Sequence, residues 1–384
     1  MTHQPPVGQR RAVPTAVALL GAYALSRLLV FAAMEVVNTL QLGGARCGDA
    51  VARPIVGFDA LARCWDSRWF LITAQQWYPA GLPAPGEQST LAFFPGYPAL
   101  IAAGSALGLP PLVVAVTFSL LFGALATLGV WQLAGCVTPP DVAVRAALLF
   151  CFFPGALVLS WAYSEALSTA LVAACLVLLY RHRWLAAGVA AAAAGATRLD
   201  VGLGVTVAAG CAAVLAIRRD GEWRALWAAL LAPLGVVAFW LFLWWRTGSP
   251  RAWTIAQDRG WDQHMDAGSH ALRTIWRVLS HPVSSPTSVL QLITLLLLVA
   301  ALVCFWQLRA PLPWAAYTAA MILVLVVSNQ VGFRPRAILL LLPLFVAAAW
   351  RLPAAAVPWV IGGFAVLQTL AIVMYLGVPL IIPP

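Results

Sequence analysis

The segment Trp65–Phe70, which reads WDSRWF, places a carboxylate between two indole rings. Indole rings can shield an acid from water and stack on the faces of a sugar. A positioned carboxylate such as Asp66 can accept a proton as a general base. The segment lies in a polar stretch, roughly residues 38–92, of an otherwise apolar chain. Proteins that only span a bilayer join their helices by short turns, so this stretch indicates an enzyme at a membrane surface.

Three further polar clusters stand at the starts of apolar runs, at Tyr163–Glu165, Thr197–Asp200 and Phe333–Arg336. A charge at the bilayer centre costs roughly 2.5–3.5 kcal/mol on insertion scales, so these groups must face protein, water or headgroups. Guanidinium forks match phosphate oxygens and helix N-termini attract anions, so the clusters favour an anion site. The alternative is interfacial snorkelling with internal ion pairs, for example Glu165 with Arg198.

The composition indicates which elements must position these groups. Hydrophobic residues make up 62% of the 384, charged residues make up 9%, and the mean hydropathy is +0.88. These values exclude a soluble globule with a polar surface. The net charge of +10 comes entirely from Arg. In a membrane protein this excess marks loops that face the cytoplasm and anionic lipid, so we expect a lipid bilayer and no nucleic acid as partner.

We expect an all-α polytopic membrane protein in which residues 1–384 form a single integral membrane domain of about eleven spans. The first apolar run is too long for the core of a signal peptide, so we expect it to remain as an anchor. The predicted spans are 13–37, 110–135, 141–160, 163–181, 184–196, 199–217, 224–246, 287–308, 312–329, 335–350 and 355–377.

Arginines in the short loops set the expected orientation. Arg181, Arg218 and Arg351 lie in loops that the positive-inside rule assigns to the cytoplasm, together with the N-terminus. The long loops, 38–109 and 247–286, then lie on the other face with most of the acids. We therefore expect a multi-pass protein of the plasma membrane with an extracytoplasmic active site.

Five motifs, in the same order along the chain, resemble those of the PIG-V family of mannosyltransferases. Trp65–Phe70 is similar to the family's W-D-S-x-W-Y motif. Leu91–Pro98, which reads LAFFPGYP, is similar to its A-F-F-P-L-Y-P motif. Phe153-Pro154, followed by Tyr163–Glu165, resembles its F-P…Y-[ST]-E pattern.

The last two motifs are shorter. Ala196–Arg198 resembles the family's A-[ST]-R, and Pro335-Arg336 matches the P-R of a P-R-Y element. Ala337 replaces the usual tyrosine of that element, which weakens the role assigned to it. The resemblance runs from about residue 27 to 345, because the motifs keep the family order over this length.

The resemblance implies a GT-C glycosyltransferase, a multi-span enzyme whose site lies at the extracytoplasmic membrane face. The donor would be a polyprenyl-phosphate mannose, the product would be α-linked by inversion, and Asp66 would be the catalytic base. The family mannosylates glycolipid anchors in animals and fungi. Arg in place of Lys, with Ala-rich helices, is typical of a high-GC bacterial genome, and a bacterial member would need another acceptor, such as a lipoglycan of the cell envelope. No cofactor and no metal are expected.

Transfer of a mannosyl group requires a base for the acceptor hydroxyl and stabilisation of the departing phosphate. We assign the base to Asp66, and Asp59 is its nearest rival and a further candidate for binding sugar or acceptor. We assign the donor phosphate to Arg198, Arg334 and Arg336. The remaining candidates for binding sugar or acceptor are Trp65, Trp69, Tyr97, Tyr163 and Glu165.

Alternatives remain open for these assignments. Asp66 could instead cap its loop or pair with Arg63 or Arg68. The 247–285 loop is typical of an acceptor-side or lid segment, and its acids and histidines match no standard metal spacing, so we predict a solvated loop there. The residues considered in that loop are Trp253, Asp258, Trp261, Asp262, His264 and His270.

A transporter or lipid flippase is the main alternative function. Pro154 and Pro233 inside predicted spans favour it, because transporters use broken helices. The chain shows no internal repeat, however, and its charges lie near one face. A structural membrane protein is a second alternative, and it predicts no consequence from changing Asp66.

Cysteine placement predicts one disulfide. Cys47 and Cys64 are the cysteines that we assign outside the spans on the expected oxidising face. We predict that they pair and brace the catalytic loop, although both could be free thiols. Cys136 lies on the cytoplasmic side, and the others lie within apolar runs.

Overall fold

The computed structural model describes residues 7–40, 64–329 and 334–377, with side chains from residue 13. Within these ranges every regular element is a helix, and strand-like pairing is confined to an isolated bridge between Met265 and Ser328. The predicted all-α architecture is therefore confirmed.

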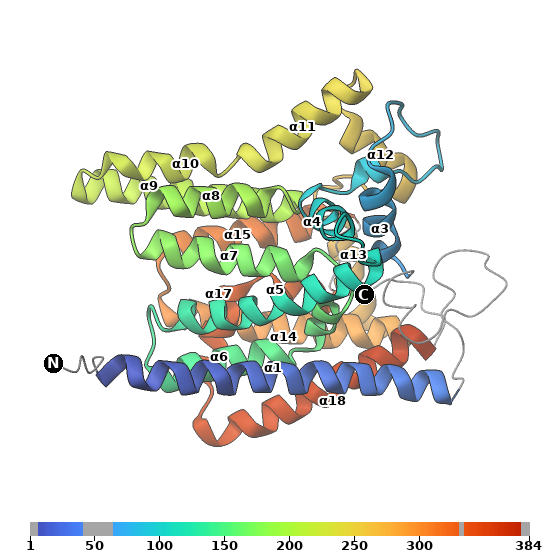
Figure 1. Ribbon diagram of the computed structural model, residues 1–384. Coiled ribbons are helices and arrows are strands. Elements are labelled where there is room, and N and C mark those ends of the chain that lie inside the picture. The colour runs from blue at the N-terminus through green and yellow to red at the C-terminus, as the bar shows by residue number, and fades with distance from the viewer. Residues whose placement is uncertain (1–6, 41–63, 330–333, 378–384) are drawn as a thin grey trace.

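Long helices lie side by side in a bundle (Figure 1). Six segments of the described chain are long and apolar enough to cross a bilayer, and a bent pair raises this number to seven. The six are α1 (Val7–Thr39), α5 (Pro111–Ala134), α9 (Leu199–Asp220), η3–α10–α11 (Trp223–Ala225, Leu226–Leu231, Leu234–Thr247), α14 (Pro286–Leu308) and η4–α18 (Ala354–Ala356, Val357–Gly377). The bent pair is α6 (Pro140–Phe152) with η2 (Pro154–Ser160).

Shorter apolar helices occupy the remaining positions at which the sequence predicts spans. They are α7 (Glu165–Tyr180), α8 (Trp184–Gly195), α15 (Leu312–Val327) and α17 (Leu342–Arg351). A helix rises about 1.5 Å per residue, so these helices are shorter than a hydrocarbon core of about 30 Å. The total of eleven spans therefore stays a prediction.

The predicted span 141–160 is not one straight helix, because α6 and η2 meet at 72°. Pro154 has no N–H to continue the ladder of α6, and the break frees backbone carbonyls that require donors inside a membrane. Arg27 of α1, only 3% exposed, supplies them. Its guanidinium donates to the carbonyl of Cys151 at 3.0 Å and to that of Ala156.

The helices outside the spans gather at one end of the bundle, where α3, α4, α12 and α13 lie together (Figure 1). The described parts of both long predicted loops therefore contain helices. The helices of this end are α3 (Asp66–Gln76), α4 (Gly96–Ser105), α12 (Ala252–Trp261) and α13 (Ser269–Ser280), with the 3-10 turn η1 (Thr90–Ala92) before α4.

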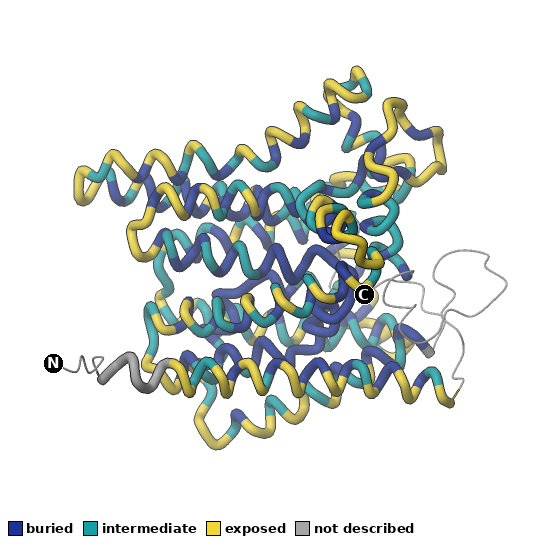
Figure 2. Tube along the Cα trace, viewed as in Figure 1, coloured by how far each residue is buried: buried dark blue, intermediate teal, exposed yellow. Residues whose placement is uncertain are grey.

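Buried residues concentrate in the middle of the bundle, and exposed ones line its outer helices (Figure 2). Large apolar side chains are among those exposed, including Leu28 of α1, Leu230 of α10 and Trp245 of α11. A soluble protein rarely exposes so much apolar surface. These outer faces suit contact with lipid.

Candidate active site

Asp66 is the first residue of α3, where the positive end of the helix dipole favours a carboxylate. The chain enters this helix through Trp65, whose φ of 52° is unusual for a residue with a side chain. The indole of Trp65 stacks on that of Trp161, with ring centroids 5.3 Å apart and planes 6° apart. This stacking holds Trp65 against Trp161 directly before Asp66, where α3 begins.

An arginine far along the sequence holds the Asp66 carboxylate. Nη1 of Arg336, in the short helix α16 (Pro335–Leu339), lies 2.6 Å from Oδ2 of Asp66 and 3.7 Å from Oε1 of Glu165. The same guanidinium lies over the ring of Tyr163, 5.4 Å from its centroid. The structure thus brings the predicted base and a predicted phosphate-binding arginine into direct contact.

Arg198 forms a second set of ion pairs beside the first. Its Nε and Nη2 donate to the two carboxylate oxygens of Asp200, each at 3.0 Å. Its Nη1 donates to Oε1 of Glu165 at 2.9 Å. The ion pair of Glu165 with Arg198, which the sequence analysis named as an example of the alternative to an anion site, is present, and Asp200 is a partner to which the sequence analysis gave no role.

Glu165 lies at the centre of these contacts and is only 1% exposed. Its Oε1 contacts both arginines, whereas Oε2 has no hydrogen-bond partner among the described residues. A buried carboxylate normally satisfies both oxygens. Glu165 therefore retains an unused acceptor inside the site.

Arg334 precedes α16 and is half-buried, and its side chain forms no ion pair or hydrogen bond with the rest of the described chain. Burial, followed by repulsion from Arg336, lowers the pKa of Arg334 to about 10. The guanidinium stays charged at neutral pH but forms no ion pair within the part of the chain that the structure describes, and Asp66 is the acid that offsets its charge electrostatically. An added anion would stabilise it.

Two glycines show how the five sequence motifs meet in space. The amide of Gly96 donates to the carbonyl of Ala196 at 2.8 Å, and a Cβ at Gly96 would lie equally close to that oxygen. A Cβ at Gly155 would overlap the backbone of Pro335. The second motif thus packs against the fourth, and the third against the fifth. The Asp66–Arg336 contact ties the first motif to the fifth.

Aromatic rings form one wall beside Asp66. Trp69 stacks on Phe93, with centroids 6.0 Å apart, and meets Trp261 of α12 edge to face at 5.5 Å. Trp65 and Trp69 are both half-buried. A role for either ring in binding sugar stays a prediction, because protein rings already cover part of each.

The two tyrosines proposed for sugar binding are fully buried. The hydroxyl of Tyr97 donates to the carbonyl of Ala115 at 2.8 Å and lies 2.7 Å from Oγ of Ser119, which ties α4 to α5. Tyr163 supports Arg336 through its ring face. Both positions suit the supporting layer of the site, and direct sugar contact stays a prediction. Asp59 lies outside the described residues.

The second long loop docks on the first through backbone acceptors. Trp253 Nε1 and Gln257 Nε2 both donate to the carbonyl of Ala92, at 3.1 Å and 3.2 Å. Arg259 donates to the carbonyl of Pro83 at 2.7 Å. Helix α12 therefore packs on the segment that leads to α4, and a lid or acceptor-side role for this loop stays a prediction.

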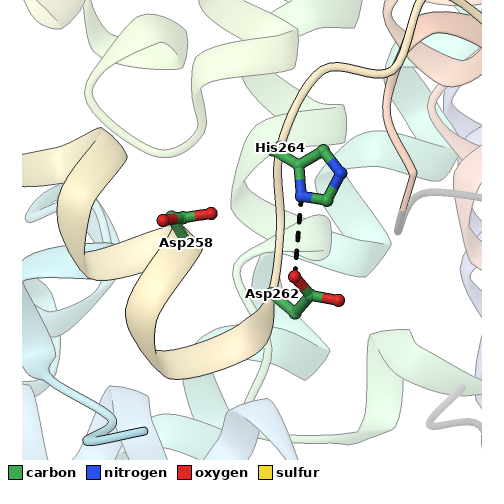
Figure 3. Close-up of side chains that lie close together, drawn as sticks. All are labelled: Asp258, Asp262 and His264. Carbon is green, nitrogen blue, oxygen red and sulfur yellow. Dashed lines mark ion pairs between the residues drawn. The ribbon is translucent and has the colours of Figure 1, made fainter. Parts of the chain in front are cut away.

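Three exposed side chains of this second loop could hold a metal ion. The ligand atoms of Asp258, Asp262 and His264 all lie within 4.8 Å of one another (Figure 3). Oδ1 of Asp262 lies 3.6 Å from Nδ1 of His264. Sequence spacing alone did not indicate this grouping, and the expected absence of a metal requirement stays a prediction.

Chelation tests that expectation. We expect mannosyl transfer to be unchanged by EDTA and by His264→Ala, since Asp258, Asp262 and His264 are all exposed to solvent. The measurement is transfer rate before and after chelation. A loss that Mn²⁺ restores in the wild type, and that Asp262→Asn reproduces, would establish a metal requirement.

Cys64 is fully buried and disulfide-bonded. Its predicted partner, Cys47, lies outside the described residues. The free thiols in the described chain are Cys136, Cys151, Cys175, Cys211 and Cys304.

Peptide mapping under non-reducing conditions is expected to recover Cys47 linked to Cys64. Closing a loop of this length is worth about 3 kcal/mol in the chain-entropy model, so Cys47→Ser should lower the melting temperature. Cys211→Ser, which removes a free thiol, is the control. Recovery of both loop cysteines as free thiols would refute the pairing.

Comparison with known proteins agrees with the motif resemblance. Residues 47–200 match the family model described as Mannosyltransferase (PIG-V), which confirms the resemblance over that range. Over 161 residues the chain is 33% identical to GPI alpha-1,6-mannosyltransferase 2 of Mus musculus. That match covers 38% of this chain and 31% of the mouse protein. Arg334 and Arg336 lie beyond the range that the family model matches.

Two solved structures share the fold. ArnT from Cupriavidus metallidurans, crystallised with undecaprenyl phosphate, aligns with a TM-score of 0.54 and 13% identity, over 94% of this chain and 76% of its own. The oligosaccharyltransferase of Archaeoglobus fulgidus, in its apo form, aligns with a TM-score of 0.51 and 12% identity, over 92% and 56% respectively. At these identities the likeness concerns the fold alone, and it confirms the predicted GT-C-like architecture.

Proposed function

We propose that this chain, whose residues 47–200 match the PIG-V mannosyltransferase family, is a membrane glycosyltransferase that transfers mannose from a lipid-linked phosphate donor. The observation that carries the proposal is the contact between Asp66 and Arg336. It joins a candidate base to a cluster of arginines within an all-helical membrane fold. Such a pairing provides the two functions that the reaction needs, proton removal and stabilisation of a departing phosphate.

The donor in this proposal is a polyprenyl-phosphate mannose. Arg336 and Arg334 bind its phosphate, since guanidinium forks match phosphate oxygens. The apolar outer faces of the bundle allow the prenyl chain to remain in the bilayer. The acceptor is a glycolipid or lipoglycan whose hydroxyl approaches Asp66.

The reaction is a single displacement at the anomeric carbon. The acceptor oxygen forms a bond to that carbon, and the bond from the carbon to the phosphate oxygen breaks. Its electron pair goes to the phosphate, which the arginines stabilise. The proton of the acceptor hydroxyl goes to Asp66. Attack from the face opposite the phosphate inverts a β-linked donor to an α-linked product.

The site is proposed to face the extracytoplasmic side of the plasma membrane. Arginines of the α7–α8 turn and the α9–α10 connection mark the opposite end of the bundle, and by the positive-inside rule that end is cytoplasmic. Arg181 and Arg218 are the examples in these two connections. Protease accessibility of α12 in sealed vesicles checks this orientation.

The direct test is transfer of labelled mannose from a short-chain polyprenyl-phosphate mannose to an acceptor extract of membranes, with the purified full-length protein. The proposal expects a labelled lipid product that α-mannosidase digests. Movement of the labelled donor between leaflets without transfer would favour the transporter alternative. Absence of transfer by a folded protein that also fails to bind polyprenyl phosphate would contradict the proposal.

A further inference from the structure

The arginines of the candidate site differ in how many carboxylates they contact. The site contains three acids, which are Asp66, Glu165 and Asp200, and three arginines, which are Arg198, Arg334 and Arg336. Arg198 has two carboxylate partners, and all three of its side-chain nitrogens donate to them. Arg334 has none in the described chain. Arg336 lies between these extremes, since one nitrogen, Nη1, faces both Asp66 and Glu165.

Asp66 is the acid whose ion pair is easiest to exchange. One contact holds it to Arg336, at 2.6 Å, and its side chain is 26% exposed, compared with 1% for Glu165. The two oxygens of Asp200, in contrast, both bind Arg198. An incoming anion therefore displaces Asp66 at lower cost than either other acid.

The Asp66–Arg336 contact engages one oxygen of the proposed base, Oδ2. A short, charged hydrogen bond directs that oxygen to the guanidinium of Arg336 and not to an approaching sugar hydroxyl. A general base must be within hydrogen-bond reach of the proton that it removes, with its own oxygen available. Transfer of Arg336 from Asp66 to a phosphate would release Oδ2 for the acceptor hydroxyl.

Two features of the site favour the replacement of Asp66 by a phosphate as the partner of Arg336. Arg334 is a charged neighbour of Arg336 without a counter-ion in the described chain, so a phosphate that bridged the two would meet two guanidinium groups. Oε2 of Glu165 is buried and unpartnered, and Oε1 lies 3.7 Å from Arg336. Glu165 can therefore keep Arg336 in place after Asp66 departs.

We propose that Arg336 is a shared partner, which holds Asp66 in the free enzyme and passes to the lipid-linked phosphate when the donor binds, so that donor binding frees the base. This inference rests on the proposed function. Binding order follows from it: the donor phosphate enters first, and the acceptor hydroxyl is deprotonated only afterwards. A free enzyme keeps its base masked, which protects against reaction of an incompletely filled site.

The experiment measures binding of a short-chain polyprenyl phosphate, without sugar or acceptor, to the purified full-length protein. Because no turnover occurs, affinity is read separately from catalysis. If Asp66 competes with phosphate for Arg336, Asp66→Asn binds the lipid phosphate roughly twofold to fivefold more tightly than wild type, the upper part of the range measured for exposed ion pairs. Asp141→Asn is the matched control, since its exposed pair with Arg145 at 2.5 Å lies in α6, away from the site. It should bind like wild type.

A double variant separates competition from general charge repulsion. In the Arg336→Ala background the contested partner is gone, so adding Asp66→Asn should bring no further gain. A gain of the same size in both backgrounds would mean simple repulsion and would overturn the inference. Equal or weaker binding by Asp66→Asn would also overturn it, and Asp66→Ser repeats the test if the Asn variant folds poorly. Absence of binding by wild type and all variants would instead contradict the proposed function.

Discussion

Asp66→Asn is expected to lower mannosyl transfer by about 10²–10⁴-fold, while fold and expression are retained and donor binding is not weakened. This range is the usual contribution of a general base and corresponds to about 3–5 kcal/mol of activation free energy. Asn keeps the shape of Asp and can still meet Arg336, but it cannot accept the proton of the acceptor hydroxyl. The measurement is transfer of labelled mannose, with thermal stability as the check on folding.

Asp59→Asn is the matched control, because Asp59 is the nearest rival acid in the sequence. It should cost far less activity than Asp66→Asn. A reversal of the two effects would move the base to Asp59. Near-normal transfer by the Asp66→Asn protein would end the mechanism proposed here, even if the family resemblance stood.

The second large effect is expected at Arg198. Arg198→Ala should weaken donor binding more than Arg198→Lys, because Lys keeps the charge but loses the fork that binds Asp200 through two nitrogens. Removing one partner of a buried ion pair costs about 3–5 kcal/mol, so the Ala variant should also melt at a lower temperature. Donor affinity and melting temperature are measured on the same preparations.

A double variant tests whether the weaker donor binding of Arg198→Ala results only from its lower stability. Arg198→Ala leaves Glu165 buried without its nearest cation, and adding Glu165→Gln removes the unpaired charge. Stability should then recover in part, whereas donor affinity should not. Wild-type donor affinity in both the Ala and Lys variants would show that Arg198 does not contribute to donor binding.

The sequence was sufficient for the class of fold, because fold class depends on local signals. Apolar runs predict helices in a membrane, and charged groups at their ends must find polar surroundings. The Glu165–Arg198 pair could also be expected, since both residues begin apolar runs at the same predicted face. These inferences require only the spacing of residues along the chain.

Pairings between distant segments could not be obtained in this way. Asp66 and Arg336 are separated by 270 positions, and nothing in either motif favours that partner over the nearby Arg68. In the fold, the backbone of Pro335 and Arg336 packs closely against Gly155, a contact that the spacing of residues along the chain does not predict. Pro154 itself indicated a break within the predicted span 141–160, but the 72° angle between α6 and η2 could not be obtained from the sequence.

The burial of Arg27 in α1 affects the order in which the helices settle in the membrane. Its acceptors on Cys151 and Ala156 are synthesised more than a hundred residues after it. Until they arrive, a lone α1 would carry a cation in the hydrocarbon, at a cost of roughly 2.5–3.5 kcal/mol for a central arginine. We therefore expect α1, although it is made before α6 and η2, to reach its final depth only once these two elements have entered the membrane beside it.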